Sequence, residues 1–134
     1  IGSAEEVVKS YYDISKGELY AIVKKIFHYF ITDEYAVKYR RLLFIERYKN
    51  SIVCELFTKM YYTDAFTFQK ELFAMLMKEE YVKKMDPQTI VLQFYSPIFL
   101  LLSIYDQYPE RIEEAEIMLQ NHVYQFYDSN FAHQ

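Results

Sequence analysis

The chain has 134 residues, a length that fits one domain able to bury a real hydrophobic core. Its formal net charge of −4 gives no cationic surface of the kind that binds nucleic acid, so this chain by itself is not expected to bind DNA. A single cysteine excludes an internal disulfide and fits a reducing compartment. We therefore expect a cytoplasmic protein.

Chain breakers are scarce, with two glycines and three prolines, which predicts a nearly all-α domain. The longest apolar run, residues 94–105, is too short to span a bilayer and contains serine and proline. No signal peptide is visible, so no membrane partner is expected. The chain begins at Ile1 and not at methionine, which suggests that an upstream segment has been removed.

Helix-start signals and apolar spacing divide the first half of the chain into five expected helices. Capping boxes at Ser3 and Ser15 open the first two helices, and Asp33 caps the third. In chain order the helices are expected over about 3–12, 15–30 and 34–49, then a fourth carrying 52–60 and a fifth carrying 68–76, with a joint at Thr63-Asp64.

The stretch from Ser15 to Tyr20 resembles the start of a recognition helix in helix-turn-helix regulators. Lys9 and Asp13, however, occupy the positions where that motif needs a small residue and a glycine turn. The continuation to Phe30 is also too apolar to face DNA. We interpret the stretch as an ordinary capped core helix, with a DNA-reading role as the alternative.

Two proline-started helices organise the second half of the chain. Asp86-Pro87 begins one over 86–106, which is apolar around most of its circumference and contains Pro97, where a kink is expected. Pro109 begins the other, over 109–131.

Both of these helices carry more apolar surface than one small domain can cover, which predicts a homodimer. In the last helix the apolar residues alternate at spacings of three and four, the pattern of packed antiparallel helices. The residues expected at the dimer interface are Ile98, Leu102, Tyr105, Ala115, Leu119, His122, Val123 and Phe126.

Aromatic residues make up 19% of the chain without any tryptophan. This excess favours either a ring-lined cavity for a small apolar or aromatic molecule or ordinary aromatic packing, and both remain open. The candidate ligand-binding residues are Tyr39, Arg40, Phe44, Glu46, Phe57, Tyr61, Phe68, Phe73, Phe94 and Tyr95.

Glu46 is expected on an apolar helix face, where a carboxylate needs a partner. It either forms an internal ion pair or tyrosine hydrogen bond, or it anchors a ligand in the cavity. Arg40 and Arg47 lie within a turn or two of it, so we expect the neutralised case, which permits a neutral or acidic ligand. An unpaired Glu46 would favour a cation.

No pattern points to catalysis. His28, His122 and His133 lack metal-ligand spacing, and Cys54 has no histidine near it in sequence and is interpreted as a structural thiol. There is no phosphate-binding loop, nucleophile elbow or paired-carboxylate motif. We expect no enzyme, no metal and no cofactor.

Several short motifs together resemble one branch of the tetracycline-repressor-like (TetR) family of transcriptional regulators. They are Asp33-Glu34-Tyr35-Ala36, Tyr39-Arg40-Arg41-Leu42-Leu43 with Ile45-Glu46, Asp86-Pro87, Phe94-Tyr95-Ser96-Pro97-Ile98-Phe99, and Asn121-His122 with Gln125-Phe126. Their order and spacing are similar to the C-terminal domain of that family from about Asp33 onward, about three quarters of the chain.

The resemblance implies an all-helical sensor domain of about six to seven helices. Its last two helices would pair with a partner's to form a four-helix bundle, with an effector cavity between the middle helices and the penultimate one. The family's DNA-binding helices are absent, so operator DNA would be bound only through a missing N-terminal domain. Residues 1–134 are thus expected to be the single effector-binding and dimerisation domain of a repressor. The alternative is a stand-alone helical interaction protein without a DNA partner.

Overall fold

The computed structural model describes residues 4–132, and it confirms the expected all-α class. The helices are α1 (Ala4–Lys9), α2 (Lys16–Thr32), α3 (Glu34–Glu46), α4 (Ser51–Thr58), α5 (Asp64–Lys78), α6 (Pro87–Tyr105) and α7 (Ile112–Asn130). A π-helical turn, η1 (Lys59–Thr63), joins α4 to α5, and a 3-10 turn, η2 (Pro109–Arg111), precedes α7. Extended pairing within residues 4–132 is limited to an isolated bridge between Val82 and Phe131.

Local capping explains where three of the helices begin. At the start of α2 the Glu18 N–H donates to Ser15 Oγ over 3.1 Å, and the Ser15 N–H donates back to the Glu18 carboxylate over 3.2 Å. Asp33 accepts from the Ala36 N–H at the start of α3, and Asp86 accepts from the Thr89 N–H at the start of α6. These side chains satisfy backbone donors that a first helical turn leaves free. The predicted box at Ser3 lies outside the described residues.

Several predicted boundaries differ from the structure. The first helix ends at Lys9 and the third at Glu46, each about one turn earlier than expected. The expected joint at Thr63-Asp64 is not a break, because both residues keep right-handed helical angles and η1 carries the helix through. By contrast, α6 continues as a helix past Pro97 to Tyr105, as expected.

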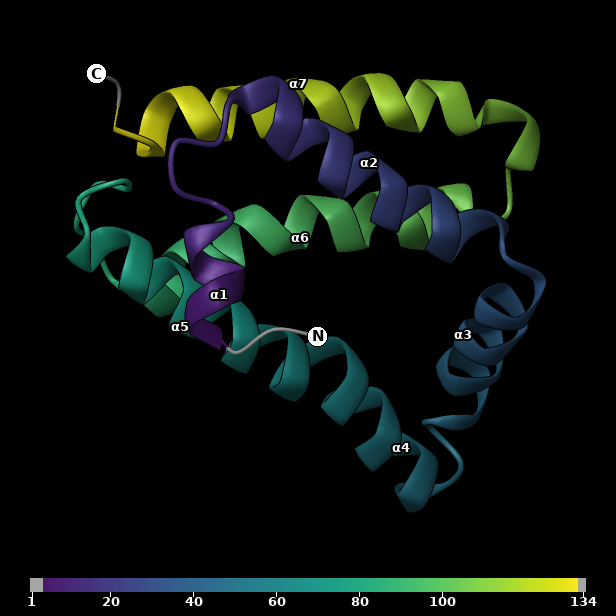
Figure 1. Ribbon diagram of the computed structural model, residues 1–134. Helices are drawn as coiled ribbons and strands as arrows, with labels where there is room; N and C mark the ends of the chain where they lie inside the picture. The colour runs from purple at the N-terminus through teal and green to yellow at the C-terminus, as the bar shows by residue number, and fades with distance from the viewer. Residues whose placement is uncertain (1–3, 133–134) are drawn as a thin grey trace.

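The helices enclose a triangle (Figure 1). Along one side α2 packs against α7, and α7 in turn packs against α6. The second side is the rod formed by α4, η1 and α5, whose α5 end packs against α6, and α3 closes the third side between α2 and α4. Within the triangle, α2 and α5 line a common cavity, to which α3 contributes no residue.

The hydrophobic core lies where α2, α5, α6 and α7 meet. Leu76, Ile90, Val91 and Val123 are among its fully buried side chains. Burying a side chain of this size stabilises the fold by about 1.5–3 kcal/mol. By contrast, α3 buries only Arg40 and Leu43, and α4 has no buried residue, so this corner is peripheral.

The apolar stripe expected at the dimer interface lies inside the chain's own core. Ala115, Leu119 and Val123 are 0% exposed. Three more of the expected interface residues are also buried, namely Leu102, Tyr105 and Phe126, whereas Ile98 and His122 are half-buried. Spacings of three and four describe any packed helix, and here α2 and α6 of the same chain cover the stripe. It is therefore an intramolecular seam.

By length and composition alone, α6 could cross a membrane. The uninterrupted apolar run covers only residues 94–105, whereas the helix starts at Pro87 and has 19 residues. In this structure α6 packs against α2, α5 and α7.

Candidate functional site

The predicted lining residues divide between two separate hollows. Phe68, Phe73 and Phe94 line a cavity between α2 and α5, which we call the central cavity. A second set lines a cleft between α3, α4 with η1, and α6, which we call the aromatic cleft; it consists of Phe44, Phe57, Tyr61 and Tyr95. Tyr39 and Glu46 line neither hollow, and Arg40 lines a different one beside Asp106. The residues of the single predicted pocket are thus distributed among separate hollows.

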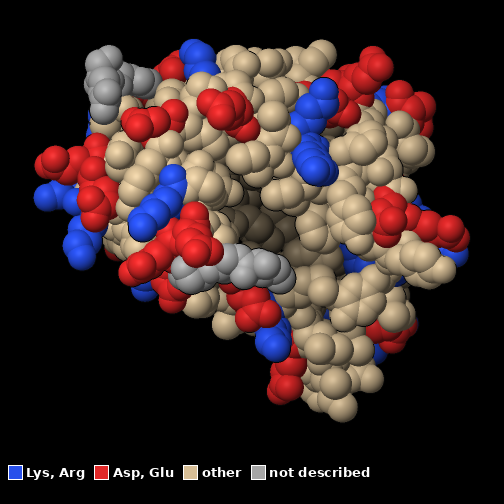
Figure 2. Space-filling view, in the orientation of Figure 1, with Lys and Arg blue, Asp and Glu red and all other residues tan. Residues whose placement is uncertain are grey.

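The central cavity has a volume of about 230 Å³. Figure 2 shows a hollow with uncharged walls within the triangle of Figure 1. Residues from five segments line the cavity, namely Tyr11, Leu19, Ile22, Val23, Ile26, Phe68, Gln69, Leu72, Phe73, Leu76, Phe94 and Phe131.

The walls of the central cavity follow from helical periodicity. In α2 the residues at 19, 22, 23 and 26 form one apolar face, and in α5 those at 68, 72, 73 and 76 form another. Leu19 and Leu72 are buried, whereas Ile26 and Phe68 are exposed. The apolar walls therefore run from buried residues to exposed ones, and the hollow between the two helices opens to solvent.

Gln69 is the polar exception in this cavity. Its Oε1 is buried and has no hydrogen-bond partner. A buried acceptor left without a donor costs about 1–3 kcal/mol. A ligand carrying an N–H or O–H group could remove that cost.

The aromatic cleft has a volume of about 330 Å³ and is walled by a network of rings. Ring centroids of Phe44 and Phe57 are 5.2 Å apart, those of Phe57 and Tyr61 are 5.0 Å apart, and those of Tyr61 and Phe99 are 5.5 Å apart. These spacings are typical of favourable edge and offset ring contacts. Phe99, which the sequence argument did not select, completes the wall from α6.

The π-helical turn η1 contributes Tyr61 and Tyr62 to this cleft. Such turns are rare and occur often at functional sites. Burial raises the pKa of Tyr61 and of Tyr95 to about 12, so both hydroxyls stay protonated at neutral pH. Both can therefore act as hydrogen-bond donors.

Arg47 brings a positive charge to the aromatic cleft. The guanidinium carbon lies 4.0 Å from the centroid of the Phe57 ring, and Nη2 donates to the Tyr48 hydroxyl. Its Nε is buried without a hydrogen-bond partner. Arg47 forms no ion pair within the described part of the chain, and no carboxylate is among the residues that line the cleft.

Arg40 is not the partner of Glu46. Its guanidinium is buried and binds the Asp106 carboxylate and the Phe30 carbonyl. Glu46 is half-buried and has no ion pair in the region from residue 4 to 132, so the expected neutralisation by Arg40 or Arg47 is wrong. Sequence reasoning missed Asp106 because it lies 66 positions from Arg40 and no periodic signal links the two.

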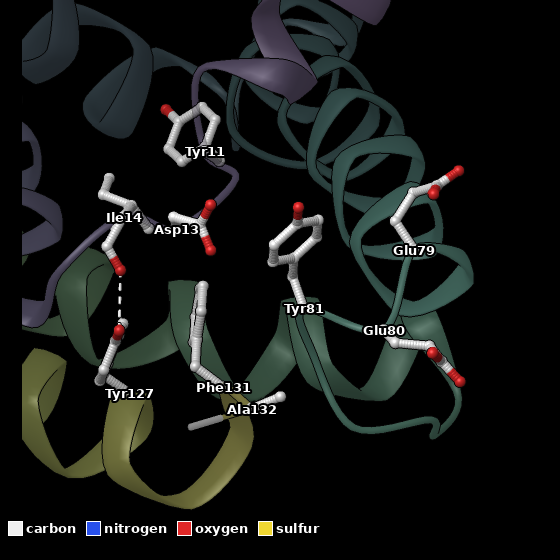
Figure 3. Close-up of a pocket in the computed structure, with 9 residues that line it drawn as sticks. All are labelled: Tyr11, Asp13, Ile14, Glu79, Glu80, Tyr81, Tyr127, Phe131 and Ala132. Atoms are coloured by element: carbon white, nitrogen blue, oxygen red, sulfur yellow. Dashed lines mark hydrogen bonds between the residues drawn. The ribbon is translucent and has the colours of Figure 1, made fainter. Parts of the chain in front are cut away.

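Another hollow, of about 460 Å³, lies where the α1–α2 connection meets the end of α5 (Figure 3). Asp13 lies there among Tyr11, Ile14 and Tyr81, whereas Glu79 and Glu80 lie on the far side of Tyr81. Among the described residues, no group of three His, Cys, Asp or Glu side chains could hold a metal ion. The predicted structural thiol, Cys54, is exposed on α4.

Comparison with known proteins gives no counterpart, because no family model, curated protein or solved structure matches this chain. The resemblance to TetR-like regulators therefore stays a sequence-based expectation. A function must be inferred from the cavities and exposed surfaces of the chain itself.

Proposed function

We propose that the chain is the effector-sensing and dimerisation domain of a TetR-like transcriptional repressor, with a small apolar or aromatic effector bound in the central cavity. The observation that carries the proposal is a preformed apolar cavity with one unpaired buried acceptor, Gln69 Oε1. Apolar walls with few polar groups are typical of small-molecule sites. The cavity volume suits a molecule of one or two rings that carries a hydrogen-bond donor.

The outer faces of α6 and α7 support the dimerisation part of this proposal. Leu100, Ile104, Ile117 and Met118 are between 43% and 61% exposed. A hydrogen bond from Tyr105 to Glu114 and the ring contact of Phe94 with Phe126 align the two helices antiparallel, which brings Leu100 level with Met118. We infer that this outer face pairs with the same face of a second copy, in place of the buried stripe predicted from the sequence.

In this proposal the chain is cytoplasmic, is not an enzyme and contacts operator DNA only through a separate N-terminal domain. The second candidate is a stand-alone helical interaction protein. This second candidate is supported by the large apolar side chains that α3 and α4 also expose, among them Tyr35, Ile45 and Ile52. Such surface is typical of protein-binding sites.

Thermal denaturation with a matched ligand pair tests the effector site. Indole and benzothiophene have similar shapes, but only indole carries an N–H donor. Indole should raise the melting temperature more, by an amount that grows with concentration above its Kd. Gln69→Leu should remove the preference for indole because it removes the acceptor.

Gln93→Leu makes the same change on the exposed face of α6 and should retain the preference for indole. If neither compound raises the melting temperature up to its solubility limit, the central cavity is not a site for this class. If Gln69→Leu retains the preference, the ligand lies elsewhere.

A further inference from the structure

We propose that the aromatic cleft is a second ligand site, separate from the central cavity, that binds planar aromatic carboxylates through an ion pair with Arg47. Arg47 stands at the end of α3 and reaches the cleft over the face of Phe57. This inference does not depend on the effector proposed for the central cavity, since the two hollows share no lining residue.

The charge of Arg47 favours an anion. Ring faces and the Tyr48 hydroxyl surround its guanidinium, and it has no carboxylate partner in the described chain. Its buried Nε N–H is also left without an acceptor. A guanidinium presents its donors in a planar fork that matches a carboxylate, so a bound carboxylate would supply both the missing charge and the missing acceptors.

The walls of the cleft favour a flat ring system. Phe44, Phe57, Tyr61 and Phe99 form a continuous set of ring contacts, and Tyr95 stacks near Phe99 with a centroid distance of 6.0 Å. An aromatic ligand can stack on or meet the edges of these rings, which an aliphatic acid cannot do. The cleft volume of about 330 Å³ accommodates a two-ring acid.

The remaining polar groups of the cleft do not oppose an anion. Burial raises the pKa of Tyr61 and Tyr95, so their hydroxyls remain neutral donors. Ser96 adds a hydroxyl from α6. Arg40 forms an ion pair with Asp106 and does not line the cleft, so Arg47 is the cation that selects the ligand.

Isothermal titration of the whole chain with 2-naphthoate and with 2-naphthamide tests this proposal. The two compounds share a shape, but only the first is an anion at neutral pH. We expect 2-naphthoate to bind at least 10-fold more tightly at low salt, with a difference that shrinks as salt increases. Cyclohexanecarboxylate should bind more weakly than 2-naphthoate.

Arg47→Gln should abolish the difference between the acid and the amide, and Arg47→Lys should retain only part of it. Lys49→Gln is the matched control, because it removes the same charge from an exposed position two residues away. Gln69→Leu should leave 2-naphthoate binding unchanged, which distinguishes this site from the central cavity.

Circular dichroism checks that each variant is folded. If Arg47→Gln fails to fold, Leu92→Trp replaces it. Leu92 lines the cleft and is exposed, so a larger side chain there should block the site without entering the core. Equal affinities for acid and amide would overturn the proposal. Unchanged binding in folded Arg47→Gln or in Leu92→Trp would do the same, as would loss of binding in Gln69→Leu.

Discussion

His122 is a polar side chain that packs between α6 and α7. Its Nε2 donates to the Phe94 carbonyl over 2.8 Å, and its ring lies beside Phe94 and Phe126. Burial lowers the pKa of His122 below its usual value, and the hydrogen bond to the carbonyl opposes this only in part. The folded chain therefore favours the neutral imidazole.

This preference predicts a pH dependence of stability. Because His122 takes up a proton at lower pH in the folded chain than in the unfolded chain, its contribution is fully present above the unfolded pKa near 6.5. The contribution is lost as the pH falls through 6.5 toward the lower folded pKa. Between about pH 8 and pH 5 the melting temperature of His122→Gln should fall less steeply than that of the wild type.

Asn121→Gln provides the control, because it changes an exposed side chain next to His122 and removes no titratable group. Its melting temperature should follow the wild-type slope. Equal slopes for His122→Gln and the wild type would show that His122 does not govern this pH response.

Among the helices, α3 and the end of α6 are joined by a polar contact at Asp106 in addition to the ring contact of Phe44 with Phe99. Leu43 and Arg40 are the buried residues of α3. The carboxylate of Asp106, at the end of α6, accepts hydrogen bonds from both Arg40 and Arg41. Asp106 is also nearly buried. Truncating one partner of a buried ion pair leaves the other charge uncompensated.

Arg40→Gln should therefore lower the free energy of unfolding by about 3–5 kcal/mol, as measured by urea denaturation. Arg41 contacts the same carboxylate over 2.9 Å but is half exposed. Arg41→Gln should accordingly cost no more than about 1 kcal/mol. Equal losses in the two variants would mean that burial does not set the strength of this contact.

At the scale of the whole molecule, the exposed face of α6 and α7 predicts a homodimer. Leu100→Glu places a charge in the proposed interface, so light scattering should show a monomer with unchanged helical circular dichroism. Leu119→Asp should instead unfold the chain, because Leu119 is 0% exposed and a charge there has no partner.

Ile52→Glu on α4 is the control for this experiment, because Ile52 is even more exposed than Leu100 but lies on another side of the triangle. It should remain a dimer if α6 and α7 form the interface. A monomeric wild type at high micromolar concentration would contradict the dimer. Loss of association only in Ile52→Glu would favour the alternative interaction surface.

Features that depend only on neighbours along the chain can be predicted from the sequence. The capping residues Ser15, Asp33 and Asp86 act within one helical turn, so their positions alone predict where α2, α3 and α6 begin. Helical periodicity likewise predicts which residues share a face. Both signals are local, and the all-α class follows from them.

Which helix faces pack against each other, in contrast, depends on how the helices cross in the folded chain. The stripe of Ala115, Leu119 and Val123 has the same periodicity whether α2 and α6 or a second copy covers it, and packing within the chain chose the former. The pairing of Arg40 with Asp106, and the division of the aromatic residues between two hollows, depend in the same way on how distant helices cross. Helical periodicity shows which residues share a face, but it does not show which other helix covers that face. The covering helix can lie anywhere along the chain, and the local spacing of apolar residues does not depend on where it lies.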